Sequence, residues 1–390
     1  MGRLTTMRPT ILLVGLGDLG GVVLDRLAGE EGFGRIVVAS RNSTRGIARC
    51  NLARLSALAE GHSIPICFTP LDINDRKAVV RTVRREAPQI ILLTATMQTW
   101  WLPDLLPPEQ AARIKSAGFG VWLPVHMTLT MKFMEALQEM AYGGIILTAP
   151  FPDVVNCVMG RLGLAPTCGL GNVEEIVSKV RLLASERLEE PLESVHVILV
   201  AHHALQPAAF GEAFKEVPPH FLRVEVDGRD VTEQIRAEEL LLAPYPVPPG
   251  RAIHSLTAGC TMSLVRALLS QDRKELHVPG PGGLPGGYPV LVSREGVEIA
   301  PIEGIGLEEA VAINERSHRF DGIERIEDDG TVVFCPEAVQ ILRTELGYDC
   351  RVLRPQEAEE RALELIARFR EYAGSYGVDL QLSGGAGHVF

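Results

Sequence analysis

Short apolar runs alternate with stretches of helical periodicity over the first 150 residues. The runs predict buried strands at 11–14, 36–39, 64–71, 90–93 and 145–147. Apolar residues at helical spacing predict helices over 22–27, 75–85 and 126–141, and Asp72 is placed to cap the second of these. Strands separated by helices need crossover connections, so the pattern predicts a parallel, doubly wound α/β sheet.

A glycine-rich segment, Gly15-Leu-Gly-Asp-Leu-Gly20, joins the first predicted strand to the first predicted helix. In that setting Gly15 makes a tight turn, Gly17 lets a pyrophosphate approach the backbone, and Gly20 lets helix and strand pack closely. The alternative is a glycine-rich turn without a ligand. We predict a Rossmann domain over residues 1–150 that binds a nicotinamide dinucleotide. The predicted contacts are Gly15, Gly17, Asp18, Leu19 and Gly20, with Thr94 and Ala95 after the fourth strand.

The end of the second strand bears on which dinucleotide binds. An NAD-binding protein usually has Asp or Glu there to accept the ribose hydroxyls. This chain has Ser40, Arg41 and Asn42, which can donate to a 2′-phosphate or pair with it. NADP(H) is therefore favoured over NAD(H), although a solvated Arg41 with weak dual specificity is the alternative.

Length and charge narrow the class of protein. A chain of 390 residues suggests two domains, and we assign 151–390 to a second, α+β substrate domain with a C-terminal extension over about 321–390. The net charge of −11 argues against a nucleic-acid partner. We expect no membrane span, because no stretch of about 18 residues is apolar and free of charges. The seven scattered cysteines, without a CxxC pair, fit reduced thiols in the cytoplasm and predict no metal site.

The second half contains an ordered series of motifs. They are Thr148-Ala-Pro-Phe-Pro-Asp153, 162–171, 181–188, a strand at 197–201 followed by His202-His203, 258–267 and 288–297. In this order the chain resembles the lactate/malate dehydrogenase superfamily over about residues 10–320. The first domain is also similar to the NADP-binding domain of saccharopine-dehydrogenase-like proteins, around 39–41 and 71–73. Residues 321–390 match neither pattern.

The departures from that superfamily concern substrate charge. The resemblance implies an Asp that orients a catalytic His and an Arg that clamps a substrate carboxylate. Here Glu175 falls at the Asp position and Ser178 at the Arg position, while a shifted alignment would offer Lys179 instead. Ala149 replaces an Asn, and the loop at 96–101 carries two tryptophans and no arginine. We therefore expect a bulkier, less anionic substrate than a small 2-keto acid.

Hydride transfer to a carbonyl or imine needs a group that exchanges a proton near neutral pH, which suits histidine. The resemblance places His203, or His202 if the register differs by one, at the catalytic position, with Glu175 orienting its imidazole. His254 is a candidate second polar group, because the family has a substrate-lining hydroxyl residue nearby. The alternative is that one of the pair is a surface histidine at a strand end and the other is structural. His126, at a helix start, is expected to be solvated.

Two further features predict packing or covering surfaces: a pair of tryptophans and an amphipathic pattern near the C-terminus. Trp100 and Trp101 would either close over a substrate as a lid or pack on the core or a neighbouring subunit. Residues 354–372 form an amphipathic pattern, which predicts a helix packed on the domain or on a partner subunit of a homo-oligomer.

The sequence therefore predicts a cytoplasmic, NADP(H)-dependent oxidoreductase that acts on a small molecule. It would transfer a hydride to or from a carbonyl or hydroxyl substrate, with a histidine as proton donor and acceptor. The alternatives are a saccharopine- or opine-type imine reductase and a non-catalytic NADP(H)-binding sensor.

Overall fold

The computed structural model of the chain describes residues 8–211 and 216–380. Its first sheet has six strands, all parallel, in the order β3-β2-β1-β4-β5-β6. The strands are β1 (Thr10–Val14), β2 (Arg35–Ser40), β3 (Ile66–Pro70), β4 (Ile90–Leu93), β5 (Ile145–Thr148) and β6 (Cys168–Gly169). The predicted doubly wound sheet is confirmed, and its order reverses between β1 and β4, where such sheets bind ligands.

Two of the helices that cover this sheet, α2 and α3, begin at a short polar side chain that caps them. The sheet's helices include α1 (Asp18–Ala28), α2 (Ser43–Ala59), α3 (Arg76–Glu86) and α5 (Leu123–Glu139). Helix α3 is capped by Asp75, whose carboxylate accepts the Ala78 N–H at 2.9 Å. The prediction that Asp72 caps it is wrong, because Asp72 accepts the main-chain N–H of Asn74 at 3.0 Å and so turns the chain ahead of the helix.

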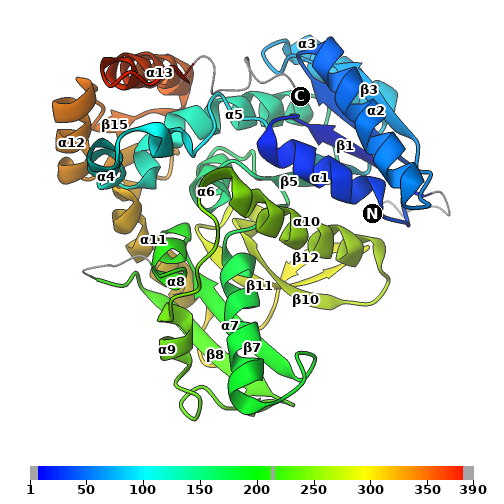
Figure 1. Ribbon diagram of the computed structural model, residues 1–390, viewed down its shortest axis with the longest axis vertical. Helices are drawn as coiled ribbons and strands as arrows, with labels where there is room; N and C mark the ends of the chain where they lie inside the picture. Colours follow the sequence, from blue (N-terminus) through cyan, green and yellow to red (C-terminus); the bar gives the residue numbers. More distant parts are fainter. Residues whose placement is uncertain (1–7, 212–215, 381–390) are drawn as a thin grey trace.

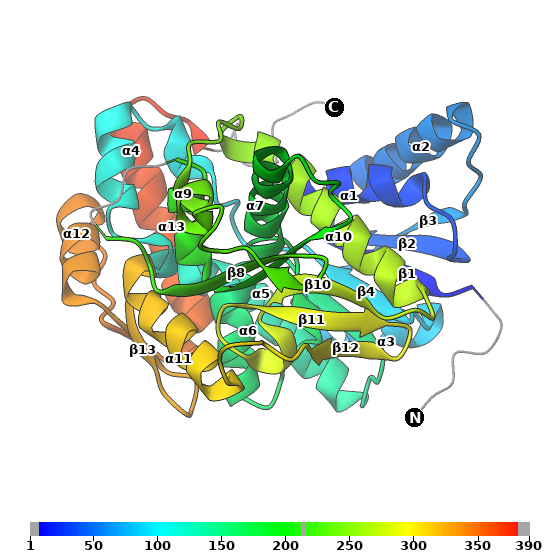
Figure 2. The same cartoon turned by 90° about the horizontal axis from the view of Figure 1, so that it is seen from below.

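The second domain is built on an antiparallel sheet in the order β10-β11-β7-β8-β9, with β12 paired to β11. The strands are β7 (Val195–Ala201), β8 (His220–Val226), β9 (Arg229–Asp230), β10 (Lys274–Pro279), β11 (Gly287–Ser293) and β12 (Gly296–Ile299). Helices α7 (Val173–Leu188), α10 (His254–Leu269) and α11 (Leu307–Ser317) pack on this sheet. Figure 1 shows this green and yellow domain below the blue first sheet, and Figure 2 shows both from below.

One helix among the described residues is long and apolar enough, by length and composition, to cross a membrane. It spans Gly250–Leu269, with half of its most apolar window buried inside the protein. Ala258, Met262 and Val265 on this helix belong to the core that it shares with α1. Packing between the two domains therefore accounts for its apolar composition.

The C-terminal extension packs on the first domain. Its elements are a small antiparallel sheet of β13 (Ile323–Ile326), β14 (Val332–Phe334) and β15 (Val352–Leu353), with helices α12 (Pro336–Leu346) and α13 (Ala358–Ser375). Helix α13, which the pattern at 354–372 predicted, lies on α5, and α12 lies on α4 (Pro108–Lys115). Figure 1 shows these orange and red helices beside the cyan ones. The apolar face of the extension is buried in the core of the first domain, although the sequence places it after the second domain.

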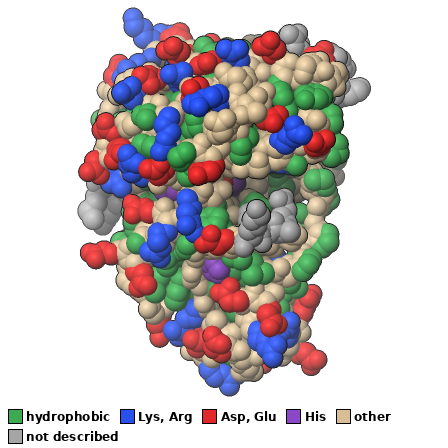
Figure 3. Space-filling view, turned by 90° about the vertical axis from the view of Figure 1, so that its left-hand side faces the viewer, with side chains coloured by type: hydrophobic (Ala, Val, Ile, Leu, Met, Phe, Trp, Pro, Cys, Tyr) green, Lys and Arg blue, Asp and Glu red, His purple; other side chains and the backbone are tan. Residues whose placement is uncertain are grey.

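The surface carries charges of both signs close together. Figure 3 shows acidic and basic side chains interspersed on one face, without a large region of one sign. The same mixture appears in the exposed ion pairs, such as Arg325 with Glu324 and Glu327, and Arg343 with Asp349.

Candidate functional site

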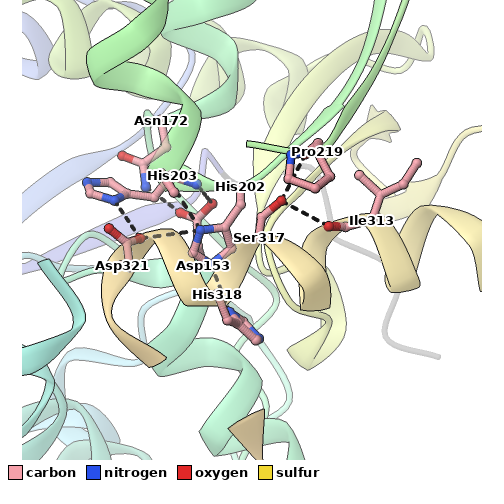
Figure 4. Close-up of polar contacts among 10 residues, drawn as sticks. Asp153, Asn172, His202, His203, Pro219, Ile313, Ser317, His318 and Asp321 are labelled. Carbon is pink, nitrogen blue, oxygen red and sulfur yellow. Dashed lines mark hydrogen bonds and ion pairs between the residues drawn. The ribbon is translucent and has the colours of Figure 1, made fainter. Parts of the chain in front are cut away.

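His203 lies just after strand β7, where three separate segments meet. Its main-chain N–H donates to Asp153 Oδ1 at 2.9 Å, and its ring Nδ1 lies 3.0 Å from Asp321 Oδ2. Asp153 is in the first turn of α6 (Pro152–Arg161), after β5, and also accepts a hydrogen bond from the Asn172 amide. Figure 4 shows these side chains converging. Within the described residues Nε2 of His203 has no hydrogen-bond partner, so this nitrogen can face a substrate.

Asp321, rather than Glu175, is the carboxylate that orients His203. Glu175 lies on α7 and accepts hydrogen bonds from Thr257 Oγ1 at 2.6 Å and from the Gln206 amide. The structure therefore corrects the expectation that Glu175 orients the imidazole of His203. Sequence reasoning missed Asp321 because it lies in a segment that matches no family motif, within the short helical turn His318–Asp321 that links α11 to β13. No local pattern marks it, since only the return of the chain to the first domain brings it to the site.

The buried carboxylates set the charge of His203. Burial alone would lower the pKa of His203, but Asp321, Asp153 and Glu175 together raise it above its ordinary value. Burial opposes ionisation of Asp321, yet His203 and His202 hold the pKa of this carboxyl well below its usual range. Both pKa shifts favour an imidazolium paired with a carboxylate, which suits His203 to donate a proton.

His202 occupies a different position from His203. Its side chain is 0% exposed, against 16% for His203, and both lie within ion-pair distance of Asp321 Oδ2. His202 Nδ1 accepts the Ala204 N–H at 3.2 Å, and Nε2 lies 3.0 Å from His318 Nδ1. Because both nitrogens of the buried His202 ring have partners, the geometry favours His203 as the group that meets a substrate.

Aromatic rings cover His203. The ring centroids of Phe119 and Phe151 lie 4.9 Å and 5.2 Å from that of His203. Phe119 also stacks on His126 at 5.2 Å, and Thr96 Oγ1 lies 3.1 Å from His126 Nδ1. The expectation of a solvated His126 is wrong, because this ring is buried, which lowers its pKa to about 3. It is therefore a neutral hydrogen-bonding group beside the site.

Two non-glycine residues with positive φ flank Asp153. Phe151 has φ 44° at the start of α6, and Asn172 has φ 48° at the start of α7. Such backbone conformations cost of order 1–3 kcal/mol each and persist where surrounding contacts hold them. Here they place the Asn172 amide on Asp153 and the Phe151 ring on His203.

The glycine fingerprint has the geometry of a dinucleotide cradle. Gly15 has φ 104°, and a Cβ there would lie 2.6 Å from the Ala95 nitrogen. Thr94 donates its hydroxyl to the Gly15 carbonyl at 3.0 Å. A Cβ on Gly20 would lie 2.9 Å from the same hydroxyl, whereas one on Gly17 would meet nothing within 4 Å. Gly15 and Gly20 thus serve close packing, while the open space at Gly17 fits an approaching pyrophosphate.

The first turn of α1 adds one unusual feature to this cradle. Gly17 is the N-cap and has no side chain to cap the helix, which leaves amides to hold a phosphate. Asp18 follows, and its Oδ2 accepts the Trp101 indole N–H at 2.9 Å. Leu19 packs its side chain against the core, so it offers a ligand its main chain.

The end of β2 also fits a phosphate. Asn42 caps α2 by accepting the Arg45 N–H at 3.0 Å through its side-chain oxygen, which leaves its amide NH₂ available to donate. Arg41 is exposed, Ser40 is partly exposed, and the first turn of α2 has no acidic residue.

The loop at 96–101, which carries the two tryptophans, contacts both domains. Trp100 donates its indole N–H to His254 Nε2 at 3.0 Å, and Trp101 donates to Asp18. Trp101 therefore contacts the glycine fingerprint, while Trp100 contacts the first residue of α10.

The two candidates for a carboxylate clamp lie elsewhere. Ser178 is exposed. Lys179 donates to the main-chain carbonyls of Leu241 at 2.8 Å, Ala243 at 2.6 Å and Ala209. Nor does any group of three or more His, Cys, Asp or Glu side chains within 8–211 and 216–380 have the arrangement of a metal site.

The parallel doubly wound domain followed by an antiparallel domain is similar in fold to solved lactate and malate dehydrogenases. Lactate dehydrogenase from Eimeria maxima, solved with NADH and oxamate, is similar at 13% identity and TM-score 0.55, over 81% of this chain and 92% of that one. Malate dehydrogenase from Plasmodium falciparum with NADH is similar at 12% identity and TM-score 0.53, over 92% of this chain and 99% of that one. Lactate dehydrogenase from Cryptosporidium parvum, complexed with lactic acid and nicotinamide adenine dinucleotide, is similar at 14% identity and TM-score 0.54. The similarity covers 81% of this chain and 99% of that one. The resemblance found in the sequence is confirmed for the fold. No family model and no curated protein matches the sequence.

Proposed function

We propose that this protein is an NADP(H)-dependent oxidoreductase that transfers a hydride to or from a carbonyl or hydroxyl substrate. The observation that carries the proposal is the His203–Asp321 pair, with Nε2 of His203 facing away from the carboxylate. The glycine cradle at Gly15 and Gly17 supports dinucleotide binding. The similar solved dehydrogenases bind NADH or nicotinamide adenine dinucleotide, which supports the same cofactor class.

The dinucleotide, when bound, supplies or takes up the hydride. His203 holds the proton on Nε2, because Asp321 fixes Nδ1–H by accepting from it. As a carbonyl oxygen gains charge, Nε2–H donates its proton to it, and in the reverse direction Nε2 takes the proton from a hydroxyl. Phe119 and Phe151 exclude water from the faces of the imidazole.

The preference for NADP(H) rests on the end of β2. Arg41 and the Asn42 amide can donate to a 2′-phosphate there, and no carboxylate in the first turn of α2 opposes it. Calorimetric titration should give NADPH at least tenfold tighter than NADH, about 1.4 kcal/mol. Arg41→Ala should remove most of this preference, while Arg54→Ala, farther along α2, serves as the control. Equal affinities in the unaltered protein would reject the preference.

The function itself is tested at His203. His203→Gln should retain NADPH binding by calorimetry and lose turnover roughly 10²–10⁴-fold on any substrate found by NADPH absorbance. A variant with full turnover would reject the role of His203. A protein that binds NADPH and turns over no substrate would instead support the sensor alternative.

Imine reduction is the second candidate, and one observation favours it. Asp153, Glu175 and Asp321 all act electrostatically on His203, and such a set of carboxylates would stabilise a protonated imine. A screen of keto acids with and without amines, followed by NADPH absorbance, separates the two reactions.

A further inference from the structure

The Trp100–His254 hydrogen bond fixes the protonation of a buried histidine. An indole N–H only donates, so Nε2 of His254, at 3.0 Å, must be the acceptor. Burial lowers the pKa of His254, which keeps the ring neutral. A neutral imidazole that accepts at Nε2 carries its proton on Nδ1. His254 is therefore a donor at Nδ1.

That donor has no acceptor in the part of the chain that the structure describes. His254 is 6% exposed, and its Nδ1 is buried without a hydrogen-bond partner. Buried polar atoms are almost always paired, so an orphaned donor needs an explanation. Other buried atoms here share this state, such as the Tyr348 hydroxyl in the C-terminal extension, but His254 lies beside the candidate site.

His254 is linked through neighbouring residues both to the dinucleotide cradle and to His203. The charge of Asp18, in the fingerprint, acts on His254. Thr257 follows one turn along α10, on the same side of the helix, and donates to Glu175, whose charge acts on His203. The Nδ1–H of His254 is therefore a candidate donor to a substrate held between the cradle and His203.

The charges around this position oppose an anionic substrate. The neighbouring carboxylates are Asp18, Asp153 and Asp321, together with Glu175, whose pKa burial raises to about 7. Among the described residues, none of them forms an ion pair with Arg or Lys, and Lys179 is committed to main-chain carbonyls. A carboxylate brought by a substrate would add to these like charges, and His203 is already paired with Asp321.

We propose that the Nδ1–H of His254 donates to an uncharged oxygen of the substrate, such as an amide or ester carbonyl, at the place where a 2-oxo acid has its carboxylate. This inference rests on the proposed function and names its substrate class. Trp100 is the positioning residue, because its indole keeps the proton of His254 on the nitrogen that faces the substrate.

The test compares phenylpyruvate with phenylpyruvamide, which differ in charge at one group. Both are titrated calorimetrically into the protein loaded with NADPH. We expect the amide to bind at least tenfold more tightly than the acid. His254→Phe should reduce this ratio to near one, and Trp100→Phe should reduce it by several-fold. Tyr376→Phe is the control, because this exposed ring contacts Tyr372 on α13 and should leave the amide-to-acid ratio unchanged.

The outcomes distinguish a failure of the His254 inference from a failure of the proposed oxidoreductase function. Equal binding, tighter binding of the acid, or no binding of the amide to NADPH-loaded protein overturns the inference and leaves the oxidoreductase proposal standing. An unchanged ratio in His254→Phe also overturns it. Failure of the unaltered protein to bind NADPH or NADH removes the proposed function, and the inference with it.

Discussion

Asp321 decides how strongly His203 holds its proton. The pKa of His203 is raised by Asp321 against the effect of burial, so His203 is charged below its raised pKa and loses the proton as pH rises through it. Reduction needs the charged form, so its rate should fall as pH rises through this raised pKa, above the ordinary range of histidine. In Asp321→Asn this fall should move to lower pH, and turnover should drop about 10²-fold or more.

A pH profile of kcat/KM for Asp321→Asn checks this role. The control is Asp328→Asn, because that carboxylate is fully exposed and its change should leave the profile in place. A profile that does not move in Asp321→Asn would show that another group titrates.

Glu175 should make stability depend on pH. Burial raises its pKa to about 7, so its protonated form is favoured in the folded state. The contribution is fully present below the unfolded pKa, about 4.3, and is lost as pH rises through 7. Between these values the protein should lose up to about 3 kcal/mol relative to Glu175→Gln, which cannot ionise. Urea unfolding at pH 5 and pH 8 measures the difference. The exposed Glu193→Gln is the control, and parallel curves for protein and Glu175→Gln would contradict the expectation.

At the scale of elements, the fingerprint turn separates packing from binding. Gly17 has φ −83° and open space around a Cβ, so Gly17→Ala should change the free energy of unfolding by less than about 1 kcal/mol. It should nevertheless weaken dinucleotide binding, because the added methyl lies where the pyrophosphate approaches. Gly15→Ala meets the backbone of Ala95 at positive φ and should destabilise the protein as well.

Thermal unfolding and calorimetric titration of both variants measure these two effects. Gly143→Ala, another glycine with open space, is the control for both. If Gly17→Ala binds the dinucleotide as tightly as the unaltered protein, the pyrophosphate does not approach the backbone at Gly17.

Elements with strong local signals were predicted, and those without them were not. Strands β1, β2 and β4 are continuous apolar runs that lie within the predicted ranges or one residue beyond them. Helix α2 was not predicted, because it carries Leu52, Leu55 and Leu58 on its exposed side and so lacks an amphipathic pattern. A surface of this kind depends on tertiary context rather than on periodicity.

At the scale of the whole molecule, the C-terminal extension should be part of the core of the first domain. The Phe369 ring on α13 meets the Trp122 ring edge-on, with centroids 5.0 Å apart, and is 0% exposed. Phe369→Ala should lower the free energy of unfolding by about 3–5 kcal/mol. Leu363→Ala, on the exposed side of the same helix, should cost less than about 1 kcal/mol. Denaturant unfolding followed by circular dichroism compares them, and similar small losses in both would mean that α13 is not part of that core.

The sequence by itself determined the parallel sheet, the glycine cradle, the histidine after β7 and the amphipathic α13. Each depends on neighbouring residues along the chain, through periodicity, a turn or a helix start. The tertiary structure alone decided that Asp321 holds His203, that Glu175 pairs with Thr257, and that Trp100 leaves His254 with an unpaired donor. These pairs join positions 118, 82 and 154 residues apart. Hydrogen bonds of that separation leave no periodic trace in the sequence, because they depend on how the domains and the returning C-terminal extension pack.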